Sequence, residues 1–158
     1  MNWKVLFAAI AMAVAGGSAQ AQSGCAAPAN INAMVNAIAS GLNATRSSNG
    51  LTALRYDAEL SQAATSHGCD MQANNYFGHQ GSNGSDMQAR ARSAGYRACM
   101  IAENLAWGYP DANQILSGWM SSPAHRNNML VNRAVDFGVG VVQGAQGPIW
   151  ILLVARPC

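Results

Sequence analysis

The chain has 158 residues, of which 50% are hydrophobic and only 10% are charged; an ordinary globular protein has about 25% charged residues. Its formal net charge of +2 comes from scattered side chains, and the absence of a basic run excludes the electrostatic footprint of a nucleic-acid-binding protein. The absence of heptads and acidic tracts likewise argues against a coiled coil or a disordered tail.

The longest apolar run lies at the N-terminus and predicts a secretory signal peptide. Lys4 precedes an apolar segment over residues 5–15, which is shorter than the roughly 17–25 residues of a transmembrane helix. Two glycines, a serine and the small-residue pattern Ala19-Gln20-Ala21 follow it, as at a signal peptidase site. We therefore expect residues 1–21 to be a signal peptide that is cleaved after Ala21.

The remaining residues, 22–158, have the length of one domain, with a core that we expect over about residues 31–154. Cleavage removes the only lysine and leaves eight arginines against seven acidic residues. The mature protein is expected to be secreted or periplasmic, with no transmembrane segment.

Four cysteines in a secreted chain predict two disulfides. Three pairings are possible for Cys25, Cys69, Cys99 and Cys158. We favour Cys25–Cys158, which would tie the termini, and Cys69–Cys99, which would tie a helix to a following loop. No pair has the C-x-x-C spacing of a zinc ribbon or a thioredoxin-type motif. Lipid attachment at Cys25 is a minority alternative, because Gln22 stands where a lipobox normally has an aliphatic residue.

Hydrophobic periodicity predicts mainly helices in the first two thirds of the chain and strands in the last third, which indicates an α+β fold. Apolar residues in the predicted helices recur at helical spacing, and Phe137, Val139 and Val141 alternate with glycines as in a strand. We expect five helices, over residues 31–45, 57–74, 85 or 86 to 93, 110 or 111 onwards, and 123 to about 130. An extended segment over 100–107 is expected before the fourth helix. Two strands are expected after the helices, over 135–142 and 149–154.

Few side chains are available for chemistry, because the predicted mature chain has three histidines and two glutamates. Glu103 lies inside an apolar segment, where a carboxylate is costly to bury unless it is paired. One interpretation is that His79, Glu103 and His125 converge, so that two imidazoles hold a zinc-like cation and the carboxylate orients water or acts as a base. The alternative is that Glu103 accepts backbone amides while the histidines bond nearby; spacing alone favours this second interpretation.

Three further features have weaker functional interpretations. His67 lies on the apolar face of the second predicted helix, so we expect a packed, hydrogen-bonded core histidine. Ser122 belongs to no nucleophile motif and stands before Pro123, where a helix N-cap is expected. The stretch Trp107-Gly108-Tyr109-Pro110 is either an exposed aromatic loop for an apolar ligand or part of the core.

Taken in order, several short segments resemble the CAP superfamily (the SCP domain), which is named after cysteine-rich secretory proteins, antigen 5 and pathogenesis-related 1 proteins. The ordered set is specific although each motif alone is weak, and it covers roughly residues 31–154. The matching segments are Leu54-Arg55-Tyr56-Asp57, Phe77-Gly78-His79, Ala102-Glu103-Asn104-Leu105-Ala106, Trp119 with Ser121-Ser122-Pro123-Ala124-His125-Arg126, and Phe137-Gly138-Val139-Gly140.

The resemblance implies a three-layer α-β-α sandwich around a small antiparallel sheet. It also implies a cleft of two histidines and two acids that often holds a divalent cation. By matching motif, His79 and His125 are the histidines and metal ligands, and Glu103 is the first acid. Ser122 stands at the position of the second acid, so the site lacks one carboxylate, which weakens two-carboxylate chemistry. Zinc or another divalent cation is the only cofactor that the resemblance suggests.

Three functions remain open at this point, because family membership alone does not fix activity. The first is a non-enzymatic binding module for an extracellular or envelope ligand, which would be a lipid, a glycan or a protein. The second is a structural envelope or stress protein whose polar cluster ties loops together. The third is a metal-dependent hydrolase with His79 and His125 as ligands and Glu103 as the base.

Overall fold

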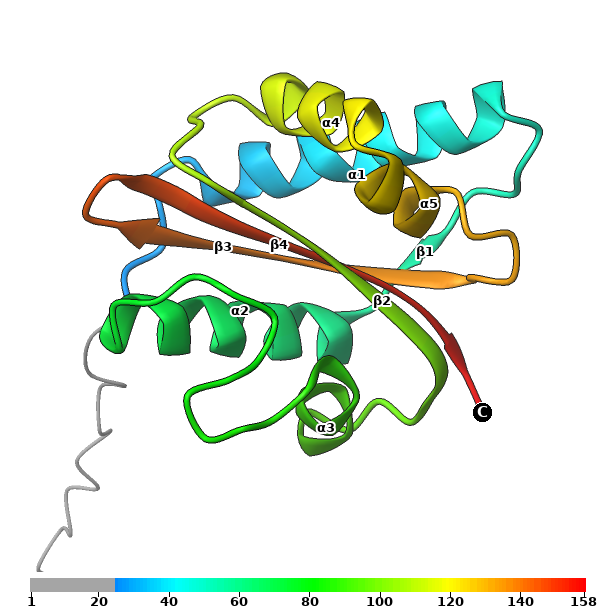
Figure 1. Ribbon diagram of the computed structural model, residues 1–158. Helices are drawn as coiled ribbons and strands as arrows, with labels where there is room; N and C mark the ends of the chain where they lie inside the picture. The colour runs from blue at the N-terminus through cyan, green and yellow to red at the C-terminus, as the bar shows by residue number, and fades with distance from the viewer. Residues whose placement is uncertain (1–24) are drawn as a thin grey trace, which may run out of the picture.

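The computed structural model describes residues 25–158, so the predicted signal peptide and its cleavage site lie outside the described residues. Figure 1 shows a sheet between two helical layers, with α1, α4 and α5 on one face and α2 and α3 on the other. This arrangement confirms the predicted α+β sandwich. The elements in order are α1 (Ile31–Ser48), β1 (Arg55–Tyr56), α2 (Ala58–Ala73), α3 (Met87–Ser93), β2 (Ala98–Trp107), α4 (Ala112–Ser121), α5 (Pro123–Met129), β3 (Asp136–Gly144) and β4 (Gly147–Pro157).

Aspartates begin three of the helices. Asp57 accepts a hydrogen bond from the backbone N–H of Leu60 at 2.8 Å, and Asp86 accepts one from Ala89 at 2.7 Å. Asp111 does the same at the start of α4. Each carboxylate satisfies an otherwise unpaired N–H in the first helical turn and carries a negative charge favourable to the helix dipole. The predicted helix starts are confirmed at these positions.

The sheet has the strand order β1-β3-β4-β2. β4 pairs antiparallel with both β3 and β2, whereas β1 pairs parallel with β3. The sequence pattern did not reveal β1, because two residues are too few to establish an alternation. β2 and β1 are therefore the outer strands. β1 pairs only with Asp136 and Phe137 at the start of β3, so it does not extend along the middle of that strand.

Two hydrophobic cores lie on opposite faces of the sheet. One contains Phe137, Val139 and Val141 of β3 and packs against α1 and α4; the other contains Ile151 and Leu153 of β4 and packs against α2. On this second face β3 has glycines, because a Cβ at Gly138 or Gly140 would collide with the backbone of α2. The predicted alternation of apolar residues and glycines thus lets α2 lie directly on β3.

The predicted disulfide pairing is wrong: the bonds are Cys25–Cys69 and Cys99–Cys158, and not Cys25–Cys158 and Cys69–Cys99. The register of the sheet explains this outcome, because β2 begins beside the end of β4 and the N–H of Cys158 donates to Arg97 O at 3.0 Å. The N-terminal segment instead runs beside the far end of β3 and reaches the last turns of α2. Within residues 25–158, no helix is long and apolar enough to cross a bilayer.

Candidate functional site

Glu103 is the centre of a polar cluster on the outer strand β2. Its side chain has no exposed surface, and it lies in a mainly apolar strand. The Nδ1–H of His79 donates to Oε1 at 2.8 Å, and Nη2 of Arg90 donates to Oε2 at 2.8 Å. The expectation that a carboxylate here must be paired is therefore met by two side chains and not by backbone amides.

Arg90 is a site residue that sequence reasoning missed. It lies in the short helix α3, and its side chain is only 9% exposed. Besides Glu103, its guanidinium donates to the carbonyls of His79 at 3.0 Å and Ser85 at 2.9 Å. Arg90 thus joins three segments: its own helix α3, the strand β2, and the loop that follows α2. The helix carries two arginines, Arg90 and Arg92, and nothing in the sequence indicates which of them reaches Glu103.

His67 fixes the loop that carries His79. The His67 side chain is fully buried, and its Nε2–H donates to Gly78 O at 2.8 Å, which confirms the predicted hydrogen-bonded core histidine. Burial lowers the pKa of His67, against the raising effect of Glu103, whose Oε1 lies 3.9 Å from Nε2. His67 is consequently a neutral support for the loop, and it does not face solvent.

His125 lies in the first turn of α5, which is fastened to β2 by two asparagines. Asn104 donates to the carbonyl of His125 at 3.0 Å. Asn128 donates to Glu103 O at 3.1 Å and to Asn104 Oδ1 at 2.9 Å. These bonds join α5 to the outer edge of β2 at the level of Glu103, so His125 approaches the site from the other face of the sheet.

The two imidazoles lie close enough to interact electrostatically. Burial lowers the pKa of His125, and the charge of His79 lowers it further. The His79 side chain is 55% exposed, and because its Nδ1 proton is used by Glu103, Nε2 is the ring nitrogen left for another partner. Of the three residues in the convergence interpretation, His79 and Glu103 are bonded directly, whereas His125 is linked to His79 only by this electrostatic effect; a shared site of all three stays a prediction.

The donor set is small for a resident metal. Carboxylate support of an imidazole from its far nitrogen is common at metal sites, but structural zinc takes about four protein ligands and catalytic zinc about three. Ser122, at the position of the missing acid, lies at the backbone N-cap position of α5 and its side chain makes no capping bond. Within residues 25–158, no group of three or more His, Cys, Asp and Glu side chains is arranged to hold a metal ion.

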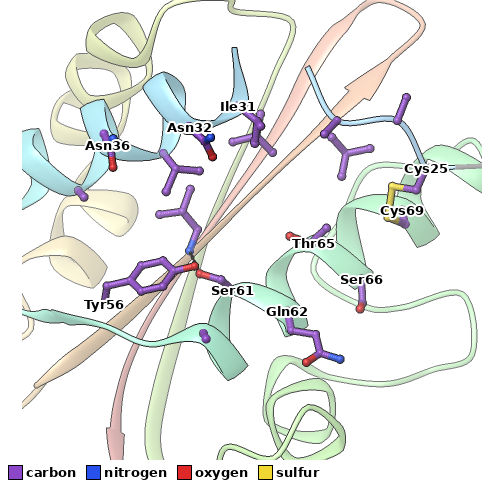
Figure 2. A pocket seen from close by; sticks show the side chains of 18 residues that line it. Cys25, Ile31, Asn32, Asn36, Tyr56, Ser61, Gln62, Thr65, Ser66 and Cys69 are labelled. Carbon is purple, nitrogen blue, oxygen red and sulfur yellow. Dashed lines mark hydrogen bonds between the residues drawn. A yellow bond between two sulfur atoms is a disulfide. The ribbon is translucent and has the colours of Figure 1, made fainter. Parts of the chain in front are cut away.

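A large cavity lies at the opposite edge of the sheet, away from this cluster. It has a volume of about 1310 Å³ and lies between α1 and α2 along β3. Figure 2 shows Asn32 and Asn36 of α1 on one side of it and Ser61 and Thr65 of α2 on the other, with the Cys25–Cys69 disulfide at one end. Its lining includes no charged residue, and none of the predicted histidine or acid site residues lines it.

Comparisons with known proteins agree with the fold and with the family that the sequence resembles. Residues 40–154 match the model of the cysteine-rich secretory protein family, CAP. The uncharacterized protein YkwD of Bacillus subtilis is 32% identical over 124 residues, which are 78% of this chain and 48% of that protein. The uncharacterized membrane protein YlbC of the same organism is 31% identical over 63% of this chain and 29% of its own length. The chain thus spans less than half the length of these relatives.

Solved structures show the same fold. An extracellular protein with an SCP domain from Bacillus anthracis superposes with a TM-score of 0.73 and 27% identity, over 79% of this chain and 41% of that one. An outer surface protein of Borrelia burgdorferi superposes with a TM-score of 0.77 and 17% identity, over 85% of this chain and 99% of that one. The sandwich, the ordered motifs and the family match together show that this chain belongs to the cysteine-rich secretory protein (CAP) family.

Proposed function

We propose that this protein is an extracellular binding protein without catalytic activity, whose ligand contacts the exposed imidazole of His79 and the partly exposed imidazole of His125. The proposal rests on the burial of Glu103 and on the pairing of both its carboxylate oxygens. A general base must come within about 3 Å of the proton that it removes, directly or through one water. Glu103 has no exposed surface, and both its oxygens are taken by His79 and Arg90. Its role is to orient His79, which favours binding over the hydrolase alternative.

The extracellular location rests on three observations. Both cysteine pairs form disulfides, which persist in oxidising compartments. The sequence before the described residues has the pattern of a signal peptide. A structural relative that is 27% identical is described as extracellular. These observations support export, to the periplasm or to the medium.

A divalent cation is a candidate ligand of the two imidazoles, but not a resident cofactor. His79 and His125 would supply two nitrogens, and Ser122 supplies no charge where the resemblance implies an acid. Two imidazoles leave most of the coordination sphere to water, so a bound cation would exchange readily. This donor set does not fit a catalytic zinc centre.

The test is binding to envelope material by the wild-type protein and matched variants. Purified peptidoglycan sacculi and phospholipid vesicles are sedimented with the protein, and release of reducing ends and amines is followed in the same samples. We expect sedimentation without hydrolysis, with at least about tenfold weaker binding in His125→Ala. Asn127→Ala, an exposed change on the same helix, is the control.

Other results would refute the proposal. Hydrolysis that disappears in Glu103→Gln would establish the hydrolase. Loss of thermal stability in His125→Ala with unchanged sedimentation would establish the structural alternative. Sedimentation with neither material would also count against a binding role at this cleft.

The cavity along β3 favours a second candidate, a lipid ligand. Ile31, Val35 and Val139 supply apolar walls, and the lining has no charge that an acyl chain would have to desolvate. Organic extraction of the purified protein, followed by mass spectrometry, would detect retained lipid. Gln62→Trp, which places a large side chain in the cavity from an exposed position, should abolish retention; an unchanged lipid content would refute this candidate.

A further inference from the structure

Two exposed aromatic side chains stack beside the His79–Glu103 pair. The rings of Phe77 and Trp107 have centroids 6.0 Å apart and planes inclined by 30°. They remain 46% and 43% exposed. Trp119 and Trp150, by contrast, are buried. Phe77 and Trp107 are therefore on the surface, and the exposed parts of their rings offer an apolar area that the fold itself does not cover.

Backbone bonds hold both rings in place. Trp107 is the last residue of β2, where it lies opposite Ile149 in β4, and the next N–H, of Gly108, donates to Pro148 O at 3.0 Å. Phe77 precedes Gly78, whose carbonyl accepts the bond from buried His67. A ligand would meet a surface that is already ordered, so little conformational entropy is lost on binding.

The aromatic pair and the imidazole of His79 form one continuous strip. Phe77 contacts Trp107. His79 follows Phe77 by two residues and bonds to Glu103, which precedes Trp107 by four residues on β2. The segment from Phe77 to His79 therefore runs antiparallel alongside β2. Residues 103 and 107 point to the same face of the strand because side chains alternate along it. One end of the strip is aromatic, and the other end carries the half-exposed imidazole of His79.

We propose that the Phe77–Trp107 stack is a binding platform for a sugar ring, with His79 as its hydrogen-bonding partner. A pyranose with equatorial substituents has an apolar C–H face that can lie on aromatic rings and a rim of hydroxyls that can bond to an imidazole. This inference rests on the proposed function and specifies its ligand as a glycan.

Charge and shape favour a neutral sugar over the other ligand classes. The buried carboxylate of Glu103 is already paired with Arg90, so the strip presents no uncompensated negative charge from this group. An acyl chain prefers a concave apolar cleft, whereas the large cavity of this protein lies at the other edge of the sheet. An exposed aromatic pair outside the large cavity and next to the imidazole of His79 is complementary to the apolar face and the hydroxyl rim of a sugar ring.

The test uses cellotetraose and chitotetraose as soluble probes, with tryptophan fluorescence and calorimetry as readouts. Because Trp119 and Trp150 are buried, Trp107 is the tryptophan of the described chain that a sugar can reach. We expect saturable binding with a blue shift of the emission. Trp107→Ala should weaken binding at least about tenfold, and Trp107→Phe should restore part of it. Tyr109→Ala, which removes an exposed ring outside the stack, is the matched control and should bind as wild type.

Three results would overturn the platform. These are no binding of either sugar at millimolar concentration, equal affinity in Trp107→Ala, or a fluorescence shift with phospholipid vesicles and none with sugars. If sacculi still bind through His125 while the soluble sugars do not, the platform assignment is wrong and the proposed function stands. If neither sacculi nor vesicles bind, the proposed function is wrong as well.

Discussion

Replacing Arg90 with methionine should destabilise the protein strongly, because it removes the cationic partner of a buried carboxylate. Glu103 has no exposed surface, and Arg90 is 9% exposed and lies 2.8 Å from Oε2. Breaking such a buried pair on one side typically costs about 3–5 kcal/mol. The variant also loses the hydrogen bonds to His79 O and Ser85 O. For a domain of this size, that cost corresponds to roughly a 10–18 °C decrease in Tm.

Urea denaturation at pH 7 measures this loss, and a double-mutant cycle with Glu103→Gln isolates the pair. The double variant should be more stable than Arg90→Met alone, because the uncompensated charge is gone. Arg92→Met, an exposed change on the same helix, should cost less than about 0.5 kcal/mol. A loss under about 1 kcal/mol in Arg90→Met, or simple additivity with Glu103→Gln, would refute the assignment of Arg90 as the charge partner.

Three further predictions follow from the same structure. Because burial lowers the pKa of His67 in the folded protein, the unfolded chain binds a proton first as the pH falls below about 6.5. Stability should therefore decrease from pH 7 to pH 5, by at most about 1.4 kcal/mol per pH unit from this group. Urea denaturation at several pH values should show that the free energy of unfolding depends less on pH in His67→Gln than in the wild type. The same pH dependence in both proteins would contradict this reasoning. EDTA should leave Tm unchanged, and calorimetry should detect only weak zinc binding that disappears in His125→Ala; tight stoichiometric zinc would contradict the two-imidazole donor set. Gly140→Ala should cost about 1–3 kcal/mol in urea denaturation, since its Cβ would meet the backbone of Thr65; a neutral substitution would contradict the close packing of α2 on β3.

Much of the fold could be predicted from sequence because local signals agreed with the tertiary structure. Asp57 and Asp86 mark helix starts through a bond that spans only three residues. The glycines of β3 were visible as an alternation with apolar residues. Glu103 stood out because a carboxylate within an apolar segment requires a partner. Each of these signals depends on few neighbours in the chain.

The missing parts depend on contacts between distant segments. The disulfide of Cys99 follows from the pairing of the start of β2 with the end of β4, and nothing near this residue in sequence indicates that register. Arg90 reaches Glu103 only because α3 packs beside β2. The exposure of Phe77 and Trp107 likewise depends on how the loop after α2 runs along the outer strand.

The most direct test of the central claim is a nitrogen-15 NMR measurement of the imidazole rings, before and after addition of glycan fragments released from sacculi by a muramidase. The claim predicts a hydrogen-bonded Nδ1 proton on His79 in the free protein, as expected from its bond to Glu103. It also predicts that the fragments shift the Nε2 signal of His79 and the ring signals of His125, while buried His67 stays unchanged. Fragment binding that leaves the rings of His79 and His125 unmoved would contradict the claim that this cleft is the binding site.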